Sequence, residues 1–168
     1  MGAPPPAQVW PRVDVDAELA PVIAAMATYA VSAVVLLAAI GVVGWFPFIP
    51  QLKNVATVEV FEKDPKTGYA LTDERAARMA QCDGLCITAS ALINGTIDGL
   101  LAAAPASVWK LLVGPSAPLC QETLELGFDA VCGARVSDSN AVVRVLQEGG
   151  CFQQIKRTGG VRLLNLEK

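Results

Sequence analysis

Three short loop segments each follow an apolar run of the chain, and they carry the side chains best placed for binding chemistry. They are segments 44–50, 90–96 and 114–118. In an open sheet of parallel strands, ligands bind beyond the carboxyl ends of the strands, where the strand order reverses. A flavodoxin-like order would place the first and second segments at that point, and a Rossmann order the first and third. Either order predicts a site that uses segment 44–50.

The first segment is aromatic rather than glycine-rich. It lacks the Gly-x-Gly-x-x-Gly pattern, so it offers no ready cradle for a dinucleotide pyrophosphate. Trp45 and Phe46 could stack on a flat ligand or pack in the core. Glu62, at the end of the next expected strand, stands where ribose-binding carboxylates stand in nucleotide-binding α/β folds, or it is simply a solvated strand end.

The second segment contains Asn94-Gly95-Thr96, which we expect to begin a helix with Asn94 as its N-cap. Gly95 would let a ligand approach the backbone, and Thr96 would add a hydroxyl beside free helix-start N–H groups. The alternative is plain helix capping with nothing bound. Ser116 in the third segment has the same two interpretations.

Together the three segments predict one ligand-binding site at the carboxyl edge of the sheet. Its expected residues are Gly44, Trp45, Phe46, Pro47, Glu62, Thr88, Ser90, Asn94, Gly95, Thr96, Gly114, Pro115 and Ser116. The chain has no histidine to act as a base for a serine or cysteine nucleophile. Catalysis by this chain is therefore weakly supported, and whether it is an enzyme stays open.

The elements that must position these segments alternate along the chain. Apolar and turn patterns predict strands over 31–43, 56–61, 84–89, 108–113 and 129–134, helices over 17–29, 48–53, 72–81, 96–104, 118–126 and 139–148, and at 161–166 a further strand or a packed tail. Alternation of this kind indicates an α/β fold with a mostly parallel sheet of five or six strands and helices on both faces. A proline-rich tail over 1–13 is expected to be disordered, and 14–168 to form a single domain.

The run from Leu19 to Leu52 contains no charged residue. Its core, roughly Val22 to Val43, is long enough to suggest a membrane span. A helix followed by a strand buried on both faces would also be uncharged, and the β-branched residues near 31–43 and the lack of flanking Lys or Arg favour that interpretation.

Charge and cysteine content bear on partners and compartment. The net charge is −3 and the isoelectric point about 4.9, and the longest basic grouping is Lys156-Arg157, so no nucleic-acid partner is expected. Five cysteines at irregular spacings do not form a disulfide pattern, which favours a reducing, cytoplasmic location.

The five cysteines fall into two groups by their position in the expected elements. Cys86 and Cys132 lie within strands and are predicted to be buried. Cys82, Cys120 and Cys151 lie nearer the ends of elements, so we expect them to be more accessible.

Motifs between Gly41 and Leu166 together resemble a known family, the C-terminal domain of the putative heavy-metal chelation family, a group of unknown function. The residues that carry the resemblance are Gly44-Trp45-Phe46-Pro47-Phe48-Ile49-Pro50, Val60-Phe61-Glu62, Thr88-Ala89-Ser90-Ala91-Leu92-Ile93-Asn94-Gly95-Thr96, Gly114-Pro115-Ser116-Ala117-Pro118-Leu119, Gly127-Phe128-Asp129 and Gly149-Gly150. Their order and spacing are fairly specific for the family and much less specific for a reaction.

The resemblance implies a Rossmann-like three-layer sandwich. In the family it is preceded by an enolase-N-terminal-like domain, with a pocket between the two suspected of handling metal. About 40 residues precede the matching part of this chain, so we expect that domain to be largely absent, or supplied by a homo-oligomer or a separate chain. The apolar surface of 20–43 would then be an interface.

The resemblance also implies a ligand, a metal ion or a metal-bearing small molecule, with a transition metal as the possible cofactor. Without histidine, its protein ligands would be Cys82, Cys120, Glu62 or backbone groups. The function expected from the sequence is therefore a binding or accessory protein for such a ligand. The alternatives are an enzyme or nucleotide-type binder that uses the same loops, and a domain tethered to a membrane through 20–43.

Overall fold

The structure is a computed structural model that describes residues 39–54, 56–62 and 72–168. The expected tail 1–13, the helix at 17–29 and most of the uncharged run 20–43 lie outside the described residues. Among the residues described, no helix is both long and apolar enough to cross a bilayer.

The described chain alternates strands and helices, as the sequence predicts. The strands are β1 Ala39–Val43, β2 Thr57–Phe61, β3 Gly84–Thr88, β4 Trp109–Val113, β5 Ala130–Val136 and β6 Val161–Glu167. The helices are α2 Ile49–Leu52, α3 Asp73–Met79, α4 Ser90–Ile93, α5 Ile97–Ala103, α6 Gln121–Glu125, α7 Ser139–Gln147 and α8 Phe152–Arg157.

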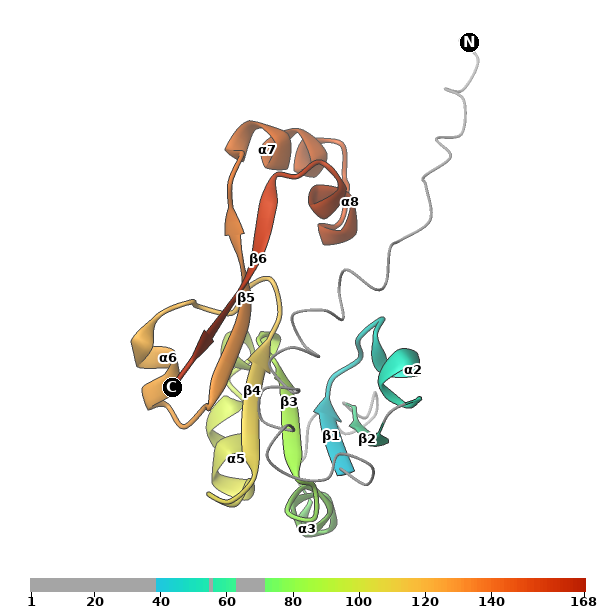
Figure 1. The fold of residues 1–168 in the computed structure, drawn as a ribbon, viewed down its shortest axis with the longest axis vertical. Helices are drawn as coiled ribbons and strands as arrows, with labels where there is room; N and C mark the ends of the chain where they lie inside the picture. The colour runs from blue at the N-terminus through green and yellow to red at the C-terminus, as the bar shows by residue number, and fades with distance from the viewer. Residues whose placement is uncertain (1–38, 55, 63–71) are drawn as a thin grey trace.

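All six strands form one sheet in the order β2-β1-β3-β4-β5-β6 (Figure 1). Strands β1 to β5 are parallel, and β6 is antiparallel to β5. The first five strands thus have the flavodoxin-like order, whose reversal point lies between β1 and β3. The predicted α/β fold with a mostly parallel sheet is confirmed, and 161–166 is a strand.

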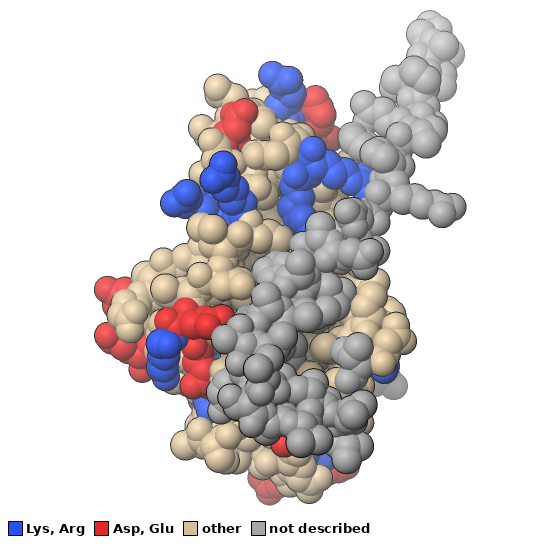
Figure 2. Space-filling model, in the orientation of Figure 1, with Lys and Arg blue, Asp and Glu red and all other residues tan. Residues whose placement is uncertain are grey.

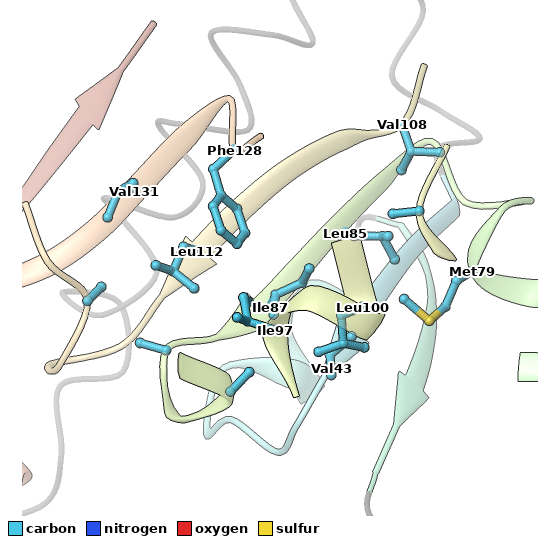
Figure 3. Packing of buried hydrophobic residues seen from close by; sticks show 14 of the residues in the cluster. Val43, Met79, Leu85, Ile87, Ile97, Leu100, Val108, Leu112, Phe128 and Val131 are labelled. Atoms are coloured by element: carbon cyan, nitrogen blue, oxygen red, sulfur yellow. The ribbon is translucent and has the colours of Figure 1, made fainter. Parts of the chain in front are cut away.

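Helices cover both faces of the sheet, which gives the layers of a Rossmann-like sandwich. On one face, Leu85, Ile87, Leu112 and Val131 pack with residues of α3, α5 and α6, such as Met79 (Figure 3). On the other face, the α2 residues Ile49 and Leu52 and the preceding Phe48 join the opposite side chains of the strands. The strands are apolar on both faces because both are covered.

Two aspartates tie the amino ends of neighbouring strands together. Asp83 accepts a hydrogen bond from the N–H of Ala39 at 2.8 Å, and Asp129 accepts one from the N–H of Lys110 at the same distance. The buried Lys110 ammonium donates to the carbonyls of Pro105 and Val108. The amino edge thereby satisfies its polar groups internally.

The β5–β6 ladder continues past the carboxyl ends of the other strands. Pairing between β4 and β5 ends at Val113 and Cys132, whereas β5 and β6 stay paired as far as Val136 and Val161. Helices α7 and α8 connect these two strands and lie at the tip of the extension (Figure 1).

Two helices were not predicted, and several element boundaries differ from the sequence predictions. Helix α8 was not predicted, and one helical turn, α4, occupies part of segment 90–96, which we expected to be a loop. Helix α6 begins at Gln121 rather than near Pro118, and β5 extends two residues beyond the predicted end, Ala134. The extension of β5 depends on pairing with β6, a partner distant in sequence.

Candidate functional site

The loop after β1 and the end of β3 touch at the reversal point of the sheet. Gly44 has φ +99°, a conformation that L side chains rarely adopt, and a Cβ built on it would lie 3.1 Å from Cγ2 of Thr88. Its N–H donates to the carbonyl of Phe61 at 3.0 Å. Gly44 therefore brings the ends of β1, β2 and β3 together and places the exposed Glu62 at the same edge.

The aromatic residues of this loop have different environments. Trp45 is 65% exposed, whereas Phe46 is half-buried and stacks on the buried Phe48 with ring centroids 5.0 Å apart. Phe46 therefore packs within the protein, whereas the side chain of Trp45 lies in solvent and is available for stacking. Pro47 is also exposed. The exposed indole offers a flat apolar surface at the carboxyl edge of the sheet.

The second loop carries two hydrogen-bonded pairs of polar side chains. Oγ1 of the half-buried Thr88 and Oγ of the exposed Ser90 are hydrogen-bonded at 2.8 Å. Asn94 Oδ1 accepts from the hydroxyl of Thr96 at 2.6 Å and from its N–H at 3.1 Å. Asn94 and Gly95 are exposed and Thr96 is half-buried, with Gly95 at φ +70°.

The prediction that Asn94 is the N-cap of the following helix is wrong. Thr96 is the N-cap residue of α5, and Asn94 is the C-cap residue of α4. Because the helical turn α4 comes first, Asn94 lies two residues before the N-cap of α5. Its side chain accepts a hydrogen bond from the N–H of Thr96, as in an Asx turn.

The third loop lies beside the second. Gly114 has φ +148°, and its added Cβ would lie 3.2 Å from Cβ of Ala89, while the N–H of Ala89 donates to the carbonyl of Val113 at 2.9 Å. Pro115 and Ser116 are exposed. Ser116 is not an N-cap, because α6 begins later and its N-cap residue is Cys120.

The three predicted loops therefore form one continuous edge. Gly44 against Thr88 joins the first loop to the second, and Gly114 against Ala89 joins the second to the third. The β2-β1-β3 order makes the first and second loops the pair that flanks the reversal point.

Sequence reasoning missed one feature of this edge. Ile93 is 78% exposed and directly precedes Asn94. The helical turn α4 is what turns this residue away from the core, and that turn was not predicted. Exposed Ile93 and Trp45 provide apolar contact area on the two loops that flank the reversal point.

The cysteines do not converge on this edge. Cys86 and Cys132 are buried, as predicted, and burial raises the pKa of each thiol to about 12. Cys82 is buried as well, contrary to the expectation that it is accessible. It precedes β3, at the amino edge, and burial, with the charges of Glu59 and Asp83, raises its pKa to about 11.

Of the weak metal candidates, only Cys120 and Glu62 are exposed. The thiol of Cys120 lies 3.3 Å from the hydroxyl of Thr123. A backbone hydrogen bond and one with Cys120 lower the pKa of the exposed Glu122. Within the part of the chain that the structure describes, His, Cys, Asp and Glu form no group of three or more able to hold a metal ion.

Comparison with known proteins agrees with this architecture. The model of the DUF364 family, described as "Putative heavy-metal chelation", matches residues 38–165. The chain belongs to the DUF364 family. No curated protein matches the chain in sequence.

Two solved DUF364 structures, both of proteins of unknown function, share the fold. The protein from Desulfitobacterium hafniense DCB-2 is 23% identical with a TM-score of 0.67, and the match covers 80% of this chain and 54% of that one. The protein from Pyrococcus horikoshii is 23% identical with a TM-score of 0.64, and the match covers 78% of this chain and 54% of that one. This chain therefore spans about half the length of either DUF364 protein.

Proposed function

We propose that this DUF364 chain is a binding or accessory protein for a metal-bearing small molecule, held at the reversal point between β1 and β3. The observation that carries the proposal is the strand order, which sets the loops after β1 and β3 side by side at the carboxyl edge. The family description, putative heavy-metal chelation, is the reason for proposing that the ligand contains a metal.

The donor types at this edge favour recognition of the organic part of such a ligand. Thr88, Ser90 and Asn94 offer neutral oxygen and amide groups, whereas heavy transition metals prefer thiolate or imidazole ligands. Hydroxyl and amide groups suit hydrogen bonding to a chelator, and the exposed Trp45 suits stacking on a flat one. The metal would then arrive with most of its own ligands.

The experiment titrates the protein with Co²⁺, Ni²⁺ and Zn²⁺, each alone and as its citrate complex. Binding is followed by isothermal calorimetry and by quenching of Trp45 fluorescence, with Trp45→Phe as the spectroscopic reference. We expect a complex to bind more tightly than its free metal, and Asn94→Ala and Trp45→Ala to weaken that binding at least tenfold.

Ser107→Ala is the matched control, because Ser107 is an exposed serine that precedes β4 at the opposite edge. It should leave the affinity unchanged. Equal affinity in Asn94→Ala, Trp45→Ala and the parent protein would contradict the proposed site. Metal and complexes that all fail to bind would contradict this ligand class.

Glu62 favours a second candidate, a nucleotide-type ligand at the same edge. Glu62 directly follows β2, the position of ribose-binding carboxylates in related α/β folds, and the carbonyl of the preceding Phe61 accepts a hydrogen bond from the N–H of Gly44. Thermal denaturation with ATP, NAD and adenosine tests it, because a ligand at 100 times its Kd adds about 2.7 kcal/mol to the free energy of unfolding. A shift that Glu62→Gln abolishes would favour this candidate, and no shift would reject it.

A partner for this edge is also part of the proposal. The described chain spans about half of its solved relatives, and Trp45 and Ile93 are apolar and exposed on the loops of the site. We propose that a second copy or another chain covers them. Sedimentation of the purified protein tests for the second copy, and Trp45→Ala with Ile93→Ala should weaken any assembly that uses this edge.

A further inference from the structure

We propose that Arg135 and Arg162 form a binding site for an oxyanion, the carboxylate or phosphate group of a ligand. The site lies on the part of the β5–β6 ladder that extends beyond the carboxyl edge. It is separate from the reversal point between β1 and β3 and does not depend on the proposed function.

The register of the ladder sets the two arginines directly opposite each other. Arg135 and Arg162 are partners in the antiparallel pairing of β5 with β6, so their side chains share one face of the sheet. Both are exposed. Because side chains alternate along a strand, this is the face on which Val131 packs against the core residues of α3, α5 and α6.

The pair lies beyond the last rung between β4 and β5. That rung joins Val113 to Cys132, and Arg135 comes three residues later. At 3.4 Å per residue in an antiparallel strand, the arginine stands about 10 Å past the end of β4. Neighbouring strands therefore do not cover it.

Like charges directly opposite each other destabilise a strand pair. Other cations do have carboxylate partners, since Arg78 pairs with Glu59 and Lys168 with Asp129. Neither Arg135 nor Arg162 has a carboxylate partner in the part of the chain that the structure describes. The adjacent rung on the same face is Gly133 with Leu164, which carries no charge. An oxyanion bound between the two guanidinium groups would relieve this repulsion.

The surrounding region is basic in an otherwise acidic protein. Segment 135–162 has a net charge of +3, whereas the whole chain has −3. Figure 2 shows Lys and Arg side chains gathered on the part that carries α7 and α8, and Asp and Glu gathered near α6. The charged residues of the segment are Arg135, Asp138, Arg144, Glu148, Lys156, Arg157 and Arg162.

A nearby loop bounds the pair on the same face. A Cβ added at Gly133 would lie 2.7 Å from the carbonyl oxygen of Ala117, so the third loop passes against β5 two residues before Arg135. Two guanidinium groups at such a place match planar oxyanions, because each group can donate two parallel hydrogen bonds to a carboxylate or phosphate.

The test compares the unmodified protein with Arg135→Gln, Arg162→Gln and the matched control Arg144→Gln, which removes an exposed arginine of α7 outside the pair. Calorimetry and thermal denaturation are measured with inorganic phosphate, with succinate and with chloride at equal ionic strength. We expect phosphate or succinate to bind the unmodified protein and to raise its Tm more than chloride does. Tighter binding of phosphate would indicate a phosphate ligand, and tighter binding of succinate a carboxylate ligand.

Each variant of the pair should bind at least tenfold more weakly, and Arg144→Gln should bind normally. Without an oxyanion, Arg135→Gln should have a Tm no lower than the unmodified protein, because the repulsion is relieved. The proposal is overturned if phosphate and succinate act only as chloride does. Equal weakening by Arg144→Gln would also overturn it, since that result indicates diffuse charge. Asn94→Ala should not alter phosphate binding, which separates this site from the proposed function.

Discussion

The two edges of the sheet use their polar residues in opposite ways. At the amino edge, Asp83 and Asp129 accept hydrogen bonds from the backbone of neighbouring strands, and the buried Lys110 donates to two carbonyls. At the carboxyl edge, the side chain of Ser90 pairs with Thr88 and that of Asn94 with Thr96, each two residues away, and both Ser90 and Asn94 remain exposed.

The contrast separates residues that hold the fold from residues that are available to a ligand. Replacing a group that satisfies a partly buried N–H leaves that N–H without a partner. Replacing an exposed hydroxyl in a loop exposes its partner to water, which substitutes for it. Variants at the amino edge should therefore change stability, and variants at the carboxyl edge should change binding.

The largest effect is expected from Cys82 at the amino edge, as the pH rises. Burial raises its pKa from about 9.0 to about 11, so the unfolded chain loses this proton first. The free energy of unfolding should fall between pH 9 and 11, by up to about 1.4 kcal/mol per pH unit from this thiol. Urea denaturation across this range measures the slope.

Cys82→Ala should reduce that slope above pH 9, and the slope between pH 7 and 9 serves as the internal control. An identical slope in the variant would show that Cys82 does not keep its proton on folding.

The next effect concerns Asp129. Asp129→Ala removes the acceptor for the N–H of Lys110 and should lower the free energy of unfolding by about 1.5–3 kcal/mol. Asp129→Asn keeps an acceptor oxygen and should cost less. Urea denaturation at pH 7 measures both variants. If Asp129→Ala lowers the free energy of unfolding by less than about 0.5 kcal/mol, as an ordinary surface substitution does, Asp129 does not help to hold the fold.

Gly44 tests whether the carboxyl edge also contains positions that hold the fold. Gly44→Ala introduces a Cβ at φ +99° and close to Thr88, and should cost about 1–2 kcal/mol. Gly99→Ala is the matched control, because an added Cβ there meets nothing within 4 Å. A cost at Gly44 no greater than at Gly99 would contradict the tight joining of the first two loops.

The smallest effect on stability is expected from Ser90. Ser90→Ala removes an exposed hydrogen bond to Thr88 and should change the free energy of unfolding by no more than about 0.5 kcal/mol. The same variant should weaken binding of the metal–citrate complex. If Ser90→Ala strongly destabilised the protein without weakening binding, it would contradict the claim that residues of the carboxyl edge serve binding rather than stability.

Much of the fold could be predicted from sequence. Uninterrupted apolar runs such as Trp109–Val113 indicate strands buried on both faces, and Thr72 caps α3 as its position before Asp73 and Glu74 suggests. Helix α8 was missed because its sequence has no strong helical pattern. Its N-terminus is organised by Gln154, whose side chain accepts a hydrogen bond from the N–H of Cys151.

The location of the three candidate loops was also predictable, since each follows an apolar strand. Which two flank the reversal point was not. Both strand orders are compatible with the same alternation of elements, because each crossover is long enough to reach either side of β1. The burial of Cys82 was equally hidden, because it depends on packing beside Gly41 of β1 and Phe61 of β2, which are distant in sequence.

The sequence by itself determined the α/β class, the family and the positions of the three loops, because these depend on local periodicity and on motifs that are contiguous in the chain. Tertiary structure decided which loops meet, which thiols are sealed from water, and that Arg135 faces Arg162 across the β5–β6 ladder. Pairing between strands distant in sequence sets all three, and the free energy of that pairing comes from contacts that no local pattern records.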